Sequence, residues 1–230
     1  MNPEKLSQRF ADHVVVMDGA MGSELLQRLP EDSRMDVAAH EHPQTVLDIH
    51  LAYIEAGAEL IETATFGSSR PRLDRAKCGD LTDSVNANAV KLAREAREIS
   101  GRDVLIGGSI APLAGVLDLD EPEGRTVIPQ AHAEQAAILA GRGADLLILE
   151  TFFRVDEMAA AVAAIRDVTD LPIIGMMTFA HERPPHPYEE QSELLDELAE
   201  RDLVAVGVNC SPGPMGALEI LRLVRQVKVP

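Results

Sequence analysis

Cys210 is the first of three side chains that could do chemistry at the end of an apolar run. It ends the run AVGVNC and is followed by a Ser-Pro-Gly-Pro turn. A thiol at the end of a strand and beside the start of a helix ionises readily, so Cys210 is a candidate soft-metal ligand or nucleophile. The alternative is a buried cysteine that only fills space.

Asp18 and Glu150 are two carboxylates in comparable positions, at the ends of the runs VVVMD and LLILE. Two carboxylates above one site could bind the ammonium group of a small substrate, or they could act as general acid and base. The alternative is that each caps the loop or helix that follows it. In either case a charge at the end of a buried run needs a partner.

The elements that must position these residues are short apolar runs, which alternate with longer segments of helical period. Such alternation is typical of βα units on a parallel sheet. We predict strands over residues 14–20, 60–66, 104–110, 146–152, 172–179 and 205–210. We predict helices over residues 43–58, 84–101, 131–144, 155–169, 188–202 and 213–227, the second of which ends on a glycine.

Polar residues recur at the carboxyl ends of the predicted strands, where a (β/α)8 barrel builds its active site. They are Asp18, Glu62, Thr65, Ser109, Glu150, Thr151, Thr178, Asn209 and Cys210. A dinucleotide-binding doubly wound fold is disfavoured, because the turn DGAMGSELL lacks the GxGxxG spacing. The sequence therefore predicts an α/β fold, a TIM-type (β/α)8 barrel truncated after about six βα units. Residues 1–230 form one domain in this interpretation.

Charge and composition exclude several classes of protein. The 38 acidic residues against 21 basic ones give the 230-residue chain a formal net charge of −17, which argues against a nucleic acid as partner. The sequence has no apolar stretch long enough for a membrane span and no signal-peptide core at its amino terminus. With only Cys78 and Cys210, a disulfide framework is not expected, so we expect a cytoplasmic location.

Five motifs follow one another between residues 17 and 214: MDGAMGSELL, YIEAGAELIETATFGSSRPRL, IGGSIAPLAG, GADLLILETFF and VGVNCSPGP. Together they resemble the homocysteine S-methyltransferases, a family that includes betaine–homocysteine methyltransferase and the homocysteine domain of cobalamin-dependent methionine synthase. The resemblance is closest to the version that is fused ahead of a methylenetetrahydrofolate reductase. It implies a (β/α)8 barrel that holds a zinc ion by three cysteines and uses it to ionise the homocysteine thiol.

The resemblance also implies roles for individual residues. Cys210 matches the first zinc cysteine, which makes it the implied catalytic residue and metal ligand. Asp18 and Glu150 match the carboxylates that hold the amino group of the substrate. The residues that match the lining of the substrate pocket are Gly19, Thr65, Ser109 and Asn209.

This sequence departs from the family pattern in two places. The family motif TNTF is here Thr63-Ala64-Thr65-Phe66, so a pocket amide is absent. The Gly-Gly-Cys-Cys-Gly motif that carries the other two zinc cysteines does not occur in the 230 residues, so we expect an incomplete Zn²⁺ site and weak zinc binding. His181 and His186 lie in a proline-rich loop that cannot form a zinc-binding helix.

The expected function is homocysteine S-methyl transfer in methionine biosynthesis: a zinc-activated thiolate of homocysteine attacks a methyl donor and gives methionine. The donor could be a folate, betaine, S-methylmethionine or a corrinoid. The alternative is a non-catalytic truncated barrel that binds an amino-acid thiol or a partner chain. Because six strands leave two unpaired edges, we expect a homodimer, or a further C-terminal segment or domain, to complete the barrel.

Overall fold

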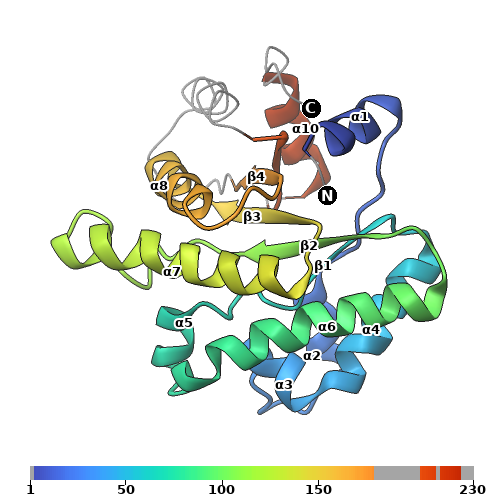
Figure 1. The fold of residues 1–230 in the computed structure, drawn as a ribbon, viewed down its shortest axis with the longest axis horizontal. Helices are drawn as coiled ribbons and strands as arrows, with labels where there is room; N and C mark the ends of the chain where they lie inside the picture. The colour runs from blue at the N-terminus through green and yellow to red at the C-terminus, as the bar shows by residue number, and fades with distance from the viewer. Residues whose placement is uncertain (1–2, 179–202, 211–212, 224–230) are drawn as a thin grey trace.

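The sheet consists of five parallel strands. The computed structural model describes residues 3–178, 203–210 and 213–223. Its strands pair in chain order, each with the next (Figure 1). They are β1 (Leu60–Glu62), β2 (Leu105–Ile110), β3 (Leu146–Phe152), β4 (Ile173–Met177) and β5 (Ala205–Val208). Each lies within a predicted range, so these five strand predictions are confirmed.

The strand predicted over residues 14–20 is wrong in length. Only Met17 forms a bridge, a parallel one to Leu60, and the backbone N–H of Asp18 donates to the Leu60 carbonyl at 3.0 Å. Val14 is 86% exposed, so the apolar run that suggested a buried strand is not covered at its start. The segment still runs beside β1, and it brings Asp18 to that strand.

Helices cover the sheet in the order of the strands that they connect (Figure 1). Neighbouring helices contact each other along the series α4 (Pro43–Ala56), α6 (Thr82–Ser100), α7 (Pro122–Arg142) and α8 (Val155–Arg166). After β5 comes α10 (Pro214–Leu223). The predicted helices are thus confirmed except the one over 188–202, which lies outside the described residues. None of the helices in the described part of the chain combines the length and the hydropathy that a membrane span needs.

Two helix ends differ in how well the sequence predicts them. Gly101 ends α6 as predicted, with a left-handed φ of 63° that glycine adopts without strain. In contrast, α7 begins at Pro122 rather than at residue 131. Pro129 lies inside this helix, and an interior proline is normally a sign that a helix has not yet begun.

Further short helices lie outside the predicted ranges, because a few residues carry little periodic signal. They are α1 (Pro3–Asp12), α2 (Met21–Arg28), α3 (Ala38–Glu41) and α5 (Arg70–Arg75), with 3₁₀ turns η1 (Met35–Val37) and η2 (Gly79–Leu81). Helix α1 matters most for the fold. Its Leu6 is fully buried in one apolar cluster with Leu60, Leu105 and Leu146, near the amino ends of the strands.

Side-chain alternation along the strands separates an inner face from an outer one. Members of the outer face pack in the clusters that hold residues of α4, α6, α7 and α8; they are Ile61, Ile106, Leu147 and Leu149. Members of the inner face join the cluster with Leu6; they are Leu60, Leu105, Leu146 and Ile148. Continuing the inner face by steps of two residues reaches Glu62, Ser109 and Glu150 at the carboxyl ends.

The topology distinguishes a barrel from a doubly wound sheet. In a doubly wound fold the strand order reverses at one point, and helices cover both faces. Here the order never reverses, and successive helices contact one another on one side of the sheet. The fold is therefore the predicted singly wound (β/α) barrel, of which the described residues form five strands where a complete barrel has eight.

Replacing Leu6 with alanine should lower the free energy of unfolding by about 2–3 kcal/mol, because α1 closes the apolar interior and the change leaves a cavity there. Urea denaturation followed by circular dichroism measures this. The control is Val14→Ala, at a side chain that is 86% exposed and should contribute little. Equal stability of the two variants would contradict the assignment of α1 as the closure of the barrel interior.

Candidate active site

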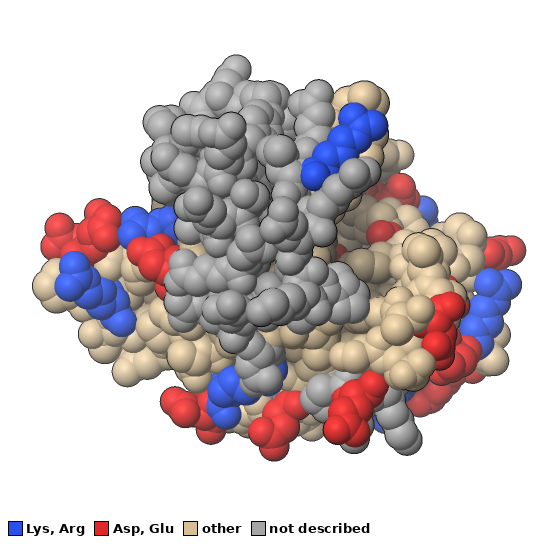
Figure 2. Space-filling model, turned by 90° about the horizontal axis from the view of Figure 1, so that it is seen from above, with Lys and Arg blue, Asp and Glu red and all other residues tan. Residues whose placement is uncertain are grey.

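Most charged side chains of the molecule are solvated. In Figure 2, acidic and basic side chains lie side by side along the outer edges of the described surface. Some form exposed ion pairs, such as Arg28 with Glu24 at 2.7 Å. Exposed pairs of this kind contribute little to stability and carry no special chemistry. Apart from Glu157, which is fully buried on α8, the acids that stand out are the partly buried ones at the carboxyl ends of the strands.

Asp18, Glu62 and Glu150 form a partly buried carboxyl cluster. The backbone N–H of Glu62 donates to Oδ2 of Asp18 at 3.0 Å, so these two residues are held side by side. The Glu62 carboxyl group lies beside that of Glu150, so the two can share a hydrogen bond when one of them is protonated. The three acids come from the segment before α2, from β1 and from β3, and the parallel pairing of the strands brings them together.

Glu150 is the best-satisfied member of the cluster. Its Oε1 accepts a hydrogen bond from the Ser109 hydroxyl, and its Oε2 accepts one from Nδ2 of Asn209 at 3.0 Å. Both donors are residues that the resemblance assigns to the pocket. The structure thus joins Ser109, Glu150 and Asn209 from three strand ends into one hydrogen-bonded group.

Burial shapes the charge of the cluster. Desolvation, assisted by the nearby Glu150, raises the pKa of Asp18 to about 7. The pKa of Glu62 is raised well above its usual range by burial first, and then by Glu150 and Asp18. Burial also raises the pKa of Glu150, although hydrogen bonds from Ser109, Glu62 and Asn209 oppose this. Three negative charges in this space would repel one another, so burial and mutual repulsion together favour the protonated forms of these acids.

Two oxygen atoms of the cluster have no hydrogen-bond partner. They are Oδ1 of Asp18 and Oε1 of Glu62, and both are buried. Buried polar atoms of proteins are nearly always paired, so an unpaired one needs a reason. For Glu62 the reason is the neighbouring cavity that it lines, from which a ligand could donate a hydrogen bond.

The cavity above the cluster has a volume of about 260 Å³. Its polar lining includes Glu62, Ser109, Glu150 and Cys210. Besides Asp36 and Thr63, the remaining lining is mainly apolar and includes Ala20, Met21, Leu25, Met35, Ala64 and Phe66. Drug-sized ligands fill cavities of about 300–1,000 Å³. This one, which we call the mouth cavity, is therefore suited to a molecule of amino-acid size with one charged and one apolar part.

Cys210 is an exposed free thiol held by an unusual backbone. Cys210 and Thr151 both have left-handed backbones, with φ of 48° and 63°. The Thr151 hydroxyl donates to the Cys210 sulfur at 3.4 Å, and Nδ2 of Asn209 donates to the same hydroxyl oxygen at 3.0 Å. Strained backbones of this kind cluster at functional sites. The buried structural cysteine considered from the sequence is therefore wrong for Cys210.

Three of the predicted site residues, Ser109, Glu150 and Cys210, line the mouth cavity, whereas Asp18, Gly19, Thr65 and Asn209 are not among its lining residues. Thr65 is fully buried, and its hydroxyl donates to the Ser109 carbonyl at 2.7 Å. This hydrogen bond holds the carboxyl end of β2. A β-carbon at Gly19 would lie 2.8 Å from the hydroxyl oxygen of Tyr53. Glycine therefore lets this turn pass close to α4. Their roles in substrate binding stay predictions.

Glu62 and Thr151 are the residues to which the sequence assigned no role. Both were recognised as polar residues at strand ends, but only the structure connects them to Glu150 and Cys210. A signal for Glu62 does exist in the sequence. It stands two residues after Leu60 as Glu150 stands two after Ile148, so alternation places both acids on the inner face.

A metal site is not complete among the described residues. Within residues 3–178, 203–210 and 213–223, no three His, Cys, Asp or Glu side chains lie so that they could hold an ion. Cys78 is buried in a separate apolar cluster, where it accepts a hydrogen bond from Arg34 at 2.6 Å. His181 and His186 lie outside the described residues.

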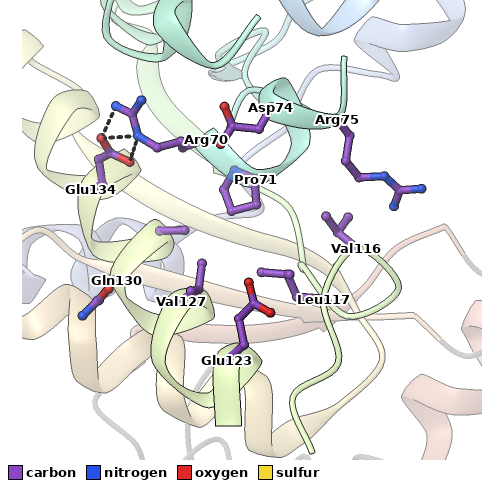
Figure 3. Close-up of a pocket in the computed structure, with 11 residues that line it drawn as sticks. Arg70, Pro71, Asp74, Arg75, Val116, Leu117, Glu123, Val127, Gln130 and Glu134 are labelled. Carbon is purple, nitrogen blue, oxygen red and sulfur yellow. Dashed lines mark hydrogen bonds and ion pairs between the residues drawn. The ribbon is translucent and has the colours of Figure 1, made fainter. Parts of the chain in front are cut away.

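A second cavity, of about 590 Å³, lies between α5, α7 and the turn at residues 116–117. Figure 3 shows Arg70 paired with Glu134 at its wall, and their Nε and Oε2 atoms are 2.9 Å apart. It shares no lining residue with the mouth cavity, and none of its lining residues has a buried polar atom without a partner. The larger space therefore has the weaker case for chemistry.

Comparison with known proteins identifies a family match and several proteins of similar sequence. The sequence model described as "Homocysteine S-methyltransferase" matches residues 15–230. The chain is 29% identical, over 190 residues, to S-methylmethionine–homocysteine S-methyltransferase BHMT2 of Pongo abelii, covering 82% of this chain and 49% of that protein. It is 26% identical to betaine–homocysteine S-methyltransferase 1 of Rattus norvegicus, covering 96% of this chain and 54% of that protein. The chain thus spans about half the length of these curated relatives.

Among solved structures, the chain is similar to the homocysteine methyltransferase MmuM from Escherichia coli in its metallated form. The TM-score is 0.79 at 23% sequence identity, with 99% of this chain and 84% of the other covered. A similarity at this level of identity shows that the two chains share a fold.

Proposed function

The chain belongs to the homocysteine S-methyltransferase family, and on that premise we propose that it binds homocysteine in the mouth cavity and serves the transfer of a methyl group to its sulfur. One observation carries the proposal. Two acids of the carboxyl cluster, Glu62 and Glu150, and an exposed thiol, Cys210, border the same cavity of amino-acid size at the carboxyl ends of barrel strands.

The carboxyl cluster supplies what an α-ammonium group needs. Asp18 and Glu150 would carry the negative charge, and the unpaired Oδ1 of Asp18 would accept one of the ammonium hydrogens. Hydrogen bonds from Ser109 and Asn209 hold the Glu150 carboxylate in place before the substrate arrives. Binding between charged partners in a buried site is strong when the geometry is fixed in advance.

The sulfur end of the substrate is then directed along the cavity wall on which Cys210 lies. In the reaction, the sulfur of homocysteine attacks the methyl carbon of the donor. The new sulfur–carbon bond forms as the bond from the methyl group to the donor breaks, and the thiol proton is lost. Since a thiol has a pKa of about 8.5, the sulfur must be deprotonated to react well near neutral pH.

The zinc ion that the resemblance implies does not fit the described residues alone, because they bring together no three side chains that could hold it. Cys210 is the one candidate ligand that they provide, and further ligands would have to come from outside the described residues. A non-catalytic module that binds the amino acid is the second candidate function, and this same observation favours it.

The test of the proposed function is direct. Equilibrium dialysis of the full chain with L-homocysteine under reducing conditions should show saturable binding. Incubation with zinc and with S-methylmethionine or betaine, the donors named for its relatives, should give methionine by mass spectrometry. Binding without turnover would support the non-catalytic module. Absence of homocysteine binding would refute both candidate functions.

Affinity for L-methionine, the stable product, should rise as the pH increases from about 5.5 to about 7.5, by up to about tenfold per pH unit. In the empty cluster the pKa of Asp18 is about 7, so below that pH a proton must leave before Asp18 can pair with the ammonium group. Glu62 and Glu150 face the same group, and burial raises the pKa of each of them as well. Isothermal titration calorimetry measures the affinities, and Asp18→Asn should flatten the profile. An unchanged profile in Asp18→Asn would contradict the role of Asp18.

A further inference from the structure

We propose that Glu62 is a third, uncharged acid of the ammonium subsite, a positioning residue that makes this subsite selective for primary ammonium groups. The inference rests on the proposed function, because it concerns the same cavity. It goes further in that neither the family resemblance nor the comparisons assign a role to Glu62.

Glu62 lies where its side chain can contact a ligand. It stands at the end of β1 on the inner face and lines the mouth cavity. Its backbone N–H donates to Asp18, and its carboxyl group lies beside that of Glu150, so Glu62 stands between the other two acids. Its Oε1 is nevertheless buried without a partner, so an acceptor remains for a ligand donor.

The hydrogen-bond partners indicate which acid keeps the proton. Two adjacent carboxyl groups can hydrogen-bond each other only if one of them is protonated. Ser109 and Asn209 both donate to Glu150, and donors stabilise the ionised form of an acid. The described residues give the Glu62 side chain no such donor, and burial disfavours its charge. Glu62 therefore keeps the proton, and its carboxyl O–H donates a hydrogen bond to Glu150.

This arrangement matches a primary ammonium group. Such a group carries three N–H donors, and the cluster offers Oδ1 of Asp18, Oε1 of Glu62 and a remaining lone pair on Glu150. A quaternary ammonium has no N–H and would leave these buried acceptors unpaired. A site built to hydrogen-bond a substrate group discriminates strongly against analogues that lack it. Glu62 would thus help to keep a trimethylated amine out of the amino-acid position.

The experiment compares two variants, Glu62→Leu and Glu62→Gln, with two probes, L-methionine and 4-(methylthio)butanoic acid. The second probe is methionine without its amino group. Isothermal titration calorimetry on the full chain measures both affinities without any metal, and circular dichroism checks the fold. Glu134→Leu is the control, since Glu134 lines the other cavity and should leave both affinities unchanged.

The wild type should prefer L-methionine over the desamino probe. Glu62→Leu should bind L-methionine about 10- to 100-fold more weakly with little change for the desamino probe, because it removes a buried acceptor. Glu62→Gln should stay within about threefold of the wild type, since an amide keeps a donor to Glu150 and an acceptor for the ligand.

The outcomes separate this proposal from the proposed function. If the wild type binds neither probe, or does not prefer L-methionine, the ammonium subsite itself is refuted. If the wild type prefers L-methionine and Glu62→Leu keeps that preference, only the role of Glu62 is refuted. Equal loss of both probes in Glu62→Leu would reveal a merely structural role. A loss in Glu62→Gln as large as that in Glu62→Leu would refute the uncharged state of Glu62.

Discussion

Replacing Glu150 with leucine is expected to weaken the binding of L-methionine by at least about 100-fold, because it removes a buried charge that pairs with the ligand. The same change leaves the Ser109 hydroxyl and Nδ2 of Asn209 without their acceptor. Asn209 also donates to the Thr151 hydroxyl, which contacts the Cys210 sulfur. Loss of Glu150 should therefore disturb the thiol end of the cavity as well as the ammonium end.

Isothermal titration calorimetry with the full chain measures this effect. Glu150→Gln keeps the size of the side chain and removes only its charge, so it should bind more tightly than Glu150→Leu but more weakly than the wild type. Glu134→Gln, at the wall of the second cavity, is the control and should bind like the wild type. If Glu134→Gln lost affinity for L-methionine while Glu150→Leu kept its affinity, the ligand would bind in the second cavity.

The second large effect concerns stability. Replacing Glu157 with alanine is expected to lower the free energy of unfolding by about 3–5 kcal/mol. Glu157 is fully buried on α8, where its carboxylate accepts hydrogen bonds from the backbone N–H groups of Leu113 and Ala114. Nε2 of His132 lies 3.4 Å from its Oε1. The change leaves these buried groups without a partner and releases the loop after β2 from α8.

Urea denaturation followed by circular dichroism measures the stability of this variant. Glu157→Gln keeps one acceptor oxygen and should lose less than Glu157→Ala. Glu98→Ala, at an exposed position on α6, should change the free energy of unfolding by less than about 0.5 kcal/mol. If Glu157→Ala were as stable as Glu98→Ala, Glu157 would not anchor the loop.

Local signals in the sequence determined the plan of the fold. Apolar runs and helical periods located β1 to β5 and the helices α4, α6, α7, α8 and α10, because each such pattern is complete within a few residues of chain. Gly101 is a further example, since its left-handed conformation ends α6 whatever lies around it. Polar residues at strand ends predicted the edge of the sheet at which Asp18, Glu150 and Cys210 meet.

Only the tertiary structure decided how those residues are connected. Asp18 contacts Glu62 across 44 positions of chain, and Asn209 contacts Glu150 across 59, so no local pattern contains these hydrogen bonds. The same holds for Thr65, whose hydroxyl supports β2, and for Val14, whose apolar run is left exposed. Period and propensity depend on neighbours in the chain, whereas burial, proton sharing and cavity shape depend on neighbours in space, which the pairing of distant strands supplies.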